Sequence, residues 1–265
     1  MDTPLTIMAV LAHPDDELDL AGTLAACAAE AARVVLVCAT PGDQGSTVDP
    51  ALATPETLGS VRMAELASCC RVLGIEELCG PLSGDSGFRS PDPPAGSLAR
   101  ARAQDVVGKL VALVRLYRPH VVITYGPDGV YGHRDHRAIG AYTTAAFGAA
   151  GDERLHPEAG EPWRPRRLFY LALPEAQRRV LYKDFDAVPI GAVTHTIDVR
   201  SYVSLKEEAE RCHRTQGAWF PWVAEALPAE EYVRAVGTEC LVLVHDAGVA
   251  DLQASGDVLR QLLAG

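Results

Sequence analysis

The chain has 265 residues, of which 48% are hydrophobic and 22% are charged, and its formal net charge at pH 7 is -11. This negative charge repels phosphate groups, which excludes general binding to nucleic acids or to anionic membranes. No apolar run approaches the roughly 18 residues of a membrane span, the N-terminus lacks a secretory signal, and the seven cysteines show no CxxC pattern, so we expect a cytoplasmic protein.

Over the first 150 residues, apolar runs that end at turn residues alternate with segments of helical period. The apolar runs predict buried strands at 5–12, 34–40, 77–82 and 120–125. The periodic segments predict helices at 18–32, 54–74, 97–117 and 134–149. Strands that alternate with helices in this way are typical of a Rossmann-like α/β fold, a mostly parallel sheet with helices on both faces.

The pattern weakens after residue 150. A polar, proline-rich segment at 151–166 precedes predicted strands at 168–173, 193–199 and 240–245 and a helix at 202–214. We expect one domain over residues 1–265, in which 1–150 form the catalytic sheet. The remainder, 151–265, should form a smaller C-terminal α/β portion that shapes the pocket.

Two dense clusters of His and Asp follow two of the predicted strands. His13-Pro14-Asp15-Asp16-Glu17 comes after the first strand, and Gly126 to His136 comes after the strand at 120–125. Ligands of parallel sheets bind beyond the carboxyl ends of the strands, so the clusters should face each other there. The three-residue spacings of His13 and Asp16, and of His133 and His136, put each pair on one side of a turn. Two His and one carboxylate suit Zn²⁺ and Fe²⁺ alike.

Structural interpretations of the same residues exist. Asp15 and Asp16 could serve as a helix cap and a first-turn acid, and either His133 or His136 could cap a helix or lie on the surface. Taken together, two such clusters at two buried strand ends favour a metal site. The competing functional classes are an Fe²⁺ enzyme of oxygen chemistry, a nucleotide- or flavin-binding module, and a catalytically inactive binding domain. The nucleotide module would need a glycine-rich first turn, which is absent.

The sequences AHPDDE and YGHRDH resemble the motifs of the PIG-L/LmbE family of zinc-dependent N-deacetylases, with similarity over roughly residues 5–150. The resemblance implies hydrolysis of an N-acetylglucosamine-type amide by a zinc-activated water, or alternatively amidase action on a larger thiol S-conjugate. It also implies roles for seven residues. The Zn²⁺ ligands are His13, Asp16 and His136, Asp15 is the general base, His133 is the acid or oxyanion partner, Asp135 tunes it, and Tyr131 assists at the tetrahedral intermediate.

Two further stretches resemble substrate-binding parts of the family, namely SVRMAELASCCRVLG with Arg62 and SGDSGF with Asp85. The expected partner is a small N-acetylated amino-sugar conjugate, without nucleic acid or membrane, and a homo-oligomer is compatible with the sequence. His213 lies in KEEAERCHRTQ, which resembles a family segment near the site. The aromatic segment Trp219, Phe220 and Trp222 either packs in the core or forms a lid over the pocket.

Overall fold

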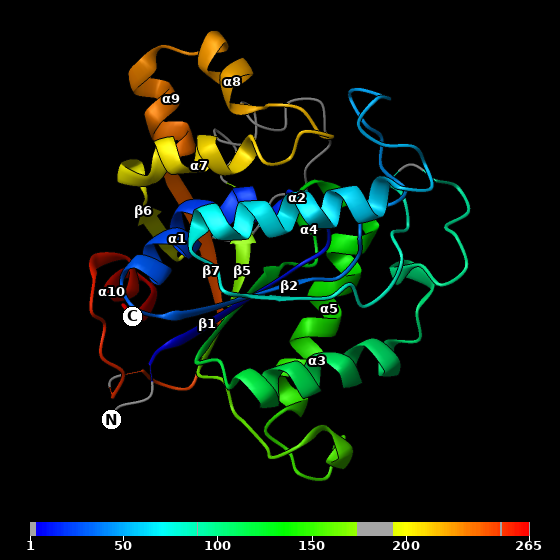
Figure 1. Cartoon of the computed structure of the whole chain (residues 1–265). Helices are drawn as coiled ribbons and strands as arrows, with labels where there is room; N and C mark the ends of the chain where they lie inside the picture. Colours follow the sequence, from blue (N-terminus) through cyan, green and yellow to red (C-terminus); the bar gives the residue numbers. More distant parts are fainter. Residues whose placement is uncertain (1–3, 89, 174–192, 250, 265) are drawn as a thin grey trace.

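The computed structural model describes residues 4–88, 90–173, 193–249 and 251–264, and one sheet runs through its centre (Figure 1). The described residues form seven strands in the order β3-β2-β1-β4-β5-β7-β6. The strands are β1 (Thr6–Leu11), β2 (Arg33–Cys38), β3 (Glu77–Cys79), β4 (Val121–Tyr125), β5 (Arg167–Ala172), β6 (His195–Asp198) and β7 (Thr238–Asp246). The pairs from β3 to β5 are parallel, and β7 is antiparallel to both β5 and β6. The predicted mostly parallel α/β fold is confirmed.

Helices cover both faces of this sheet (Figure 1). On one face α3 (Ala103–Tyr117) packs against α5 (Arg134–Ala149), and on the other lie α1 (Ala21–Ala29), α2 (Leu58–Leu73) and α7 (Val203–Glu210). The short α4 (Gly129–Gly132), α8 (Phe220–Ala226), α9 (Ala229–Val236) and α10 (Asp257–Leu263) complete the α-helices of the described residues. No helix of this part of the chain is both long and apolar enough to cross a membrane.

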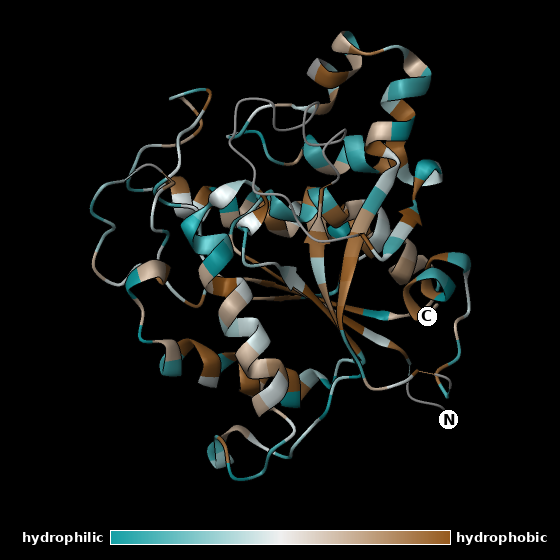
Figure 2. Ribbon diagram, turned by 180° about the vertical axis from the view of Figure 1, so that it is seen from behind, coloured by the Kyte–Doolittle hydropathy of each residue, from teal (hydrophilic) through white to brown (hydrophobic). Residues whose placement is uncertain are grey.

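The core is made by the strands, which carry the apolar runs of the sequence, and by the buried side chains of the helices that pack on them (Figure 2). All residues of β1 and β4 are buried, because helices cover both faces of these central strands. Helix α5 comes very close to β4 at Gly140, where an added Cβ would lie 2.4 Å from the carbonyl oxygen of Tyr125. This close approach packs the N-terminal half of α5 against the carboxyl end of β4.

Segment 151–166 lies between α5 and β5 in the sequence. The chain before it and the chain after it still belong to one sheet, because β5 pairs directly with β4. Arg115 holds this segment from α3. Its buried guanidinium donates to the carbonyl oxygens of Ala150, Asp152, Leu155, His156 and Gly160. The predicted strands after residue 150 therefore extend the sheet of the first part.

The helices differ most from the sequence-based prediction. The helix expected at 18–32 is a 3-10 turn at Asp16–Leu20 followed by α1, and the helix expected at 202–214 already ends at Glu210. The helix ends early at Glu210 because the residues after it contact distant parts of the chain, where His213 and Thr215 bind the carboxylates of Glu17 and Glu65. Helices α8, α9 and α10 were not predicted, and each has eight residues or fewer.

The strand order reverses at β1, because β2 and β3 follow on one side of it and β4 and β5 on the other. The loops that follow β1 and β4 diverge at such a point and leave a crevice between them. The two His/Asp clusters occupy these two loops, so they lie where an α/β sheet binds its ligand.

Candidate metal centre and substrate pocket

Asp16 joins the two clusters across the crevice. Its Oδ2 lies 3.3 Å from Nδ1 of His13, and its Oδ1 lies 3.2 Å from Nε2 of His136. The Oδ2 atom also accepts hydrogen bonds from the backbone N–H groups of Ala12 (3.1 Å) and His13 (2.7 Å). All three side chains are buried. The structure thus brings the three residues predicted as metal ligands into direct contact.

The hydrogen bonding of His136 fits a metal ion. Its Nδ1 lies 3.2 Å from the carbonyl oxygen of Gly129, an acceptor, so Nδ1 carries a proton, and in the neutral ring Nε2 then carries a lone pair. That buried Nε2 has no hydrogen-bond partner and faces a carboxylate oxygen. Two electron-pair donors facing each other repel unless a cation lies between them. An imidazole whose second nitrogen donates to a carbonyl is also the usual metal-bound arrangement.

His13 meets carboxylates on both sides of its ring. Opposite Asp16, its Nε2 lies 3.3 Å from Oδ2 of Asp135 and 3.5 Å from Oδ1 of Asp85. Burial works against a charged ring, but Asp16 and the other carboxylates raise the pKa of His13 well above its usual value. The surroundings of His13 therefore stabilise positive charge, which a divalent cation would supply.

Two triplets that share His13 place their ligand atoms within 4.8 Å of one another, namely His13 with His133 and His136, and His13 with Asp85 and Asp135. His13 belongs to both triplets, so the candidate centre lies around this residue. Asp135 was predicted to tune His133, but its carboxylate instead contacts His13 and accepts from the N–H of Ser86 at 2.9 Å.

Asp15 lies beside this centre in an unusual backbone conformation. Its φ is 95°, in the left-handed region that residues other than glycine rarely adopt. Its Oδ1 lies 3.2 Å from Nη2 of Arg62, and its side chain does not cap the following 3-10 turn. Burial raises the pKa of Asp15 to about 6, although the charge of Arg62 opposes this shift. The alternative role of Asp15 as a helix cap is thus not adopted.

Arg62 and Asp85, the two predicted substrate contacts, are each only 4% exposed. Arg62 donates to the carbonyl oxygens of Gly42 at 3.0 Å and Pro14 at 2.5 Å, and Asp85 accepts from the N–H groups of Gln44 at 3.1 Å and Gly87 at 2.8 Å. Both side chains therefore hold loops around the centre in this structure. Direct contact with a substrate would require these hydrogen bonds to rearrange.

His133 begins helix α5 and caps it. Its Nδ1 accepts from the N–H of Asp135 at 3.1 Å, and its ring stacks on Phe88 with the centroids 5.1 Å apart. This bond leaves the single proton of the neutral ring on Nε2. Burial, together with His13 and His136, lowers the pKa of His133 to about 2. His133 is therefore a neutral hydrogen-bond donor as well as a helix cap.

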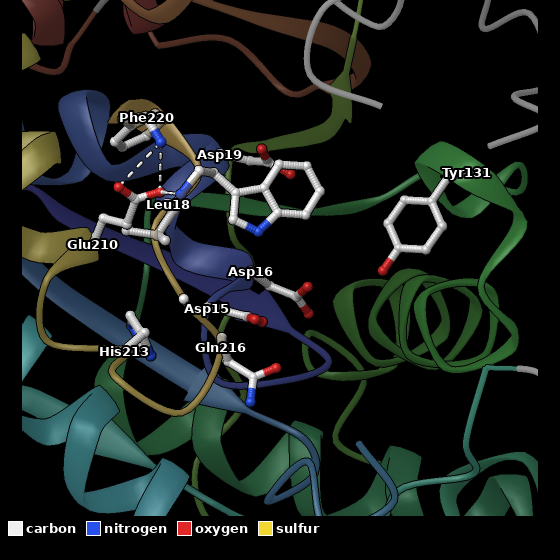
Figure 3. Close-up of a pocket in the computed structure, with 11 residues that line it drawn as sticks. Asp15, Asp16, Leu18, Asp19, Tyr131, Glu210, His213, Gln216 and Phe220 are labelled. Atoms are coloured by element: carbon white, nitrogen blue, oxygen red, sulfur yellow. Dashed lines mark hydrogen bonds between the residues drawn. The ribbon is translucent and has the colours of Figure 1, made fainter. Parts of the chain in front are cut away.

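Tyr131 is carried by a strained turn between β4 and α5. The preceding Val130 is β-branched and buried, yet has φ 66°, which is sterically unfavourable. Such strain persists only where the surroundings fix the backbone, and it is commonly found at functional sites. Burial raises the pKa of Tyr131 well above its usual value, so its hydroxyl keeps its proton. Figure 3 shows this hydroxyl directed across the pocket toward Asp16.

A pocket next to the centre has a wall from the C-terminal part of the chain (Figure 3). Its lining residues from the two motif regions are Asp15, Asp16, Leu18, Asp19 and Tyr131, and those from the far wall are Glu210, His213, Gln216, Gly217, Trp219 and Phe220. Of the predicted aromatic segment, Trp219 is 40% exposed at this pocket, whereas Phe220 is buried in a small core with Val223. The side chain of Trp222 lies outside the described residues.

Sequence reasoning singled out His213, Trp219 and Phe220 of this wall and missed the other half. Glu210, Gln216 and Gly217 have no motif of their own, and they reach the pocket because the chain leaves α7 and turns back before α8. The one available signal was the segment KEEAERCHRTQ, which contains Glu210, His213 and Gln216.

The chain is similar to known deacetylases in sequence and in fold. The family model of the GlcNAc-PI de-N-acetylases, PIG-L, matches residues 8–147. A 1D-myo-inositol 2-acetamido-2-deoxy-alpha-D-glucopyranoside deacetylase of Streptomyces avermitilis is 35% identical over 88% of this chain and 92% of its own length. Among solved structures, the N,N'-diacetylchitobiose deacetylase of Pyrococcus horikoshii superposes with a TM-score of 0.66 at 19% identity, covering 91% of this chain and 84% of that one.

A protein of different activity shares the fold as well. A 4-carboxy-2-hydroxymuconate hydratase from Pseudomonas putida KT2440 has a TM-score of 0.66 at 18% identity, covering 94% of this chain and all of the other. Since one fold serves both a deacetylase and a hydratase, the fold alone does not define the reaction. The family match and the residues of the site must define it.

Proposed function

This chain belongs to the PIG-L family, and we propose that it is a zinc-dependent deacetylase that removes the acetyl group from N-acetylglucosamine linked to a neutral cyclitol such as inositol. The contact of Asp16 with both His13 and His136 carries the proposal. This contact joins the two motifs into one centre with Asp15 at its side. The name of the relative from Streptomyces avermitilis supports the substrate class, because that relative matches most of the chain.

Three side chains would hold the metal ion, His13 through Nδ1, Asp16 through its carboxylate and His136 through Nε2. Two neutral imidazoles and one carboxylate are a common ligand set of catalytic zinc. A bound zinc ion acts as a Lewis acid, which polarises a carbonyl group and lowers the pKa of water from 15.7 to about 7. Asp135 would fix the ring of His13 from behind through the 3.3 Å contact between Oδ2 and Nε2.

The remaining side chains would move the protons. Asp15 takes a proton from the attacking water as the water oxygen bonds to the acetyl carbon. The Nε2–H of His133 and the hydroxyl of Tyr131 donate to the oxygen that becomes negative. The bond from carbon to nitrogen then breaks, and the proton on Asp15 passes to the leaving nitrogen, giving a free amine and acetic acid, which releases its proton to water as acetate. The bond from Asp135 N–H to Nδ1 of His133 supports this assignment, since it disfavours a second proton on that ring.

The charge of the pocket supports a neutral partner for the sugar. The described lining residues include the carboxylates of Asp15, Asp16 and Asp19 but no Lys or Arg. The guanidinium of Arg62 lies beside Asp15 and is already paired with its carboxylate. An aglycone with a phosphate or carboxylate group would be repelled by this lining. The hydroxyls of a neutral cyclitol can instead hydrogen-bond to Gln216, and its C–H face can pack against Trp219.

Release of free amine tests the proposal. The zinc-loaded enzyme is assayed with N-acetylglucosaminyl-inositol, the same compound carrying an inositol phosphate, and a thiol S-conjugate of an acylated glucosaminyl-inositol. We expect amine release that is fastest with the first compound, is abolished by a chelator and returns with Zn²⁺. Release from the S-conjugate alone would assign the enzyme as an amidase instead, and no release from any of the three would refute the proposed function.

A further inference from the structure

We propose that Glu17 and His213 form a buried positioning pair that fixes the backbone of Asp15. Through this pair, the pocket wall between α7 and α8 controls the orientation of the base. The inference rests on the proposed function for the role of Asp15, whereas the pair itself rests on contacts that do not involve the metal ligands.

The Glu17 carboxylate uses its two oxygens on two different parts of the chain. Its Oε2 accepts from the N–H of Asp15 at 3.0 Å, and its Oε1 lies 2.5 Å from Nε2 of His213. The side chains of Glu17 and His213 are each 1% exposed. A carboxylate buried this deeply destabilises the fold if one of its hydrogen-bond donors is missing. Loss of the His213 donor should therefore also disturb the hydrogen bond from Glu17 to Asp15.

The conformation of Asp15 requires such support. A left-handed φ of 95° in a residue with a side chain is unfavourable and persists only when its surroundings fix it. Glu17 fixes the backbone of Asp15 by accepting a hydrogen bond from its N–H. Arg62 fixes the Asp15 carboxylate, which lies 3.2 Å from its guanidinium. If the peptide relaxes, the Asp15 carboxylate turns away from the position of the water.

The wall that carries His213 is itself anchored twice more. Glu65 of α2 accepts from the N–H and the hydroxyl of Thr215 at 2.9 and 2.6 Å. Glu210 accepts from the N–H of Phe220 at 2.8 Å. Three buried carboxylates thus hold the segment from 211 to 219, and among them Glu17 alone also binds the base. Glu65 therefore offers a matched control.

A metal ion is a poor explanation for this cluster, although Glu17, Cys69 and His213 place ligand atoms within 4.8 Å of one another. Tetrahedral zinc with bonds of about 2.0–2.2 Å separates an oxygen and a nitrogen ligand by about 3.3 Å. The Glu17 and His213 atoms lie 2.5 Å apart, which is a hydrogen-bond distance. Burial also raises the pKa of the Cys69 thiol, which disfavours the thiolate that a metal would need.

The test compares variants of His213 in the zinc-loaded enzyme. His213→Leu removes the donor, whereas the amide nitrogen of His213→Gln can replace Nε2. We expect His213→Leu to lower kcat about 10- to 100-fold with little change in KM, as a base misplaced by an ångström would do, and His213→Gln to recover most of the loss. Glu17→Gln, which can satisfy only one of the two donors, should behave like His213→Leu. Bound zinc should stay at the wild-type level in all three.

The control Glu65→Gln weakens a different anchor of the wall, at Thr215, and leaves the hydrogen bonds of Glu17 to His213 and Asp15 in place, so we expect it to raise KM while kcat is retained. Crystal structures of His213→Leu and Glu17→Gln supply a readout that needs no substrate, since φ of residue 15 should leave the left-handed region. The proposal is overturned if φ stays there, if His213→Gln and His213→Leu lose equal activity, or if Glu65→Gln lowers kcat as much. An inactive wild-type enzyme would instead refute the proposed function, and the φ comparison would still decide the inference.

Discussion

The motif loops after β1 and β4 and the wall between α7 and α8 border the same pocket, but the chain builds them by opposite means. The motif loops concentrate His13 to Glu17 and Tyr131 to His136 in two short runs, each directly behind a buried strand. The wall depends on contacts between distant residues, such as Glu17 with His213 and Glu65 with Thr215, which are 196 and 150 positions apart. The motif loops carry the reacting groups, whereas the wall shapes the substrate pocket and, through His213, supports the base.

The largest effect should come from Asp15 in the first region. Asp15→Asn removes the base but keeps the size of the side chain, so kcat should fall roughly 10²- to 10⁴-fold while bound zinc remains. In the wild type, kcat/KM should fall as the pH drops through the pKa of Asp15, because only the ionised carboxylate accepts a proton. Burial puts that pKa at about 6, and a bound cation moves it lower.

A pH profile of both proteins checks this prediction, with the acid limb at or below pH 6 in the wild type and missing in the variant. An Asp15→Asn enzyme with wild-type turnover would show that the chemistry does not depend on this carboxylate.

An intermediate effect should come from Asp135, which contacts a proposed ligand but not the position of the substrate. Asp135→Asn weakens the 3.3 Å contact with Nε2 of His13 and should lower zinc affinity about 10- to 100-fold. Competition with a chromogenic chelator measures the affinity. Asp246, which forms an ion pair with Arg167, provides the control. It lies in the sheet far from the centre, so Asp246→Asn should leave zinc binding unchanged. Equal zinc affinities of Asp135→Asn and the wild type would show that Asp135 does not support the proposed ligand His13.

The smallest effect should come from Trp219 in the second region. Trp219→Ala removes an exposed indole from the pocket, and loss of its contact with the sugar conjugate should raise KM about 3- to 10-fold with kcat unchanged. The control is Leu116→Ala on α3, an exposed apolar side chain outside the pocket, which should change neither constant. A Trp219→Ala enzyme that loses kcat instead would show that this side chain contributes to the chemical step and not only to substrate binding.

The same division explains what the sequence could predict. The buried strands at 5–12 and 120–125 could be predicted because they are apolar runs in the sequence. The residues of the candidate centre could be predicted because the two clusters directly follow these strands. The end of α7 at Glu210 was not, because Glu17 and Glu65 bind the following segment and override its helical period. The side chains of Arg62 and Asp85 show a similar limit, since their burial depends on backbone groups of other loops.

The central claim is that His13, Asp16 and His136 hold one catalytic cation between the loops after β1 and β4. A crystal structure of the zinc-loaded protein, with anomalous scattering recorded on both sides of the zinc edge, tests this claim most directly. We predict one fully occupied ion bound to Nδ1 of His13, the Asp16 carboxylate and Nε2 of His136. An ion bound instead by His13, Asp85 and Asp135, or by Glu17, Cys69 and His213, would contradict the claim, as would a zinc-loaded protein with no ion between the two loops.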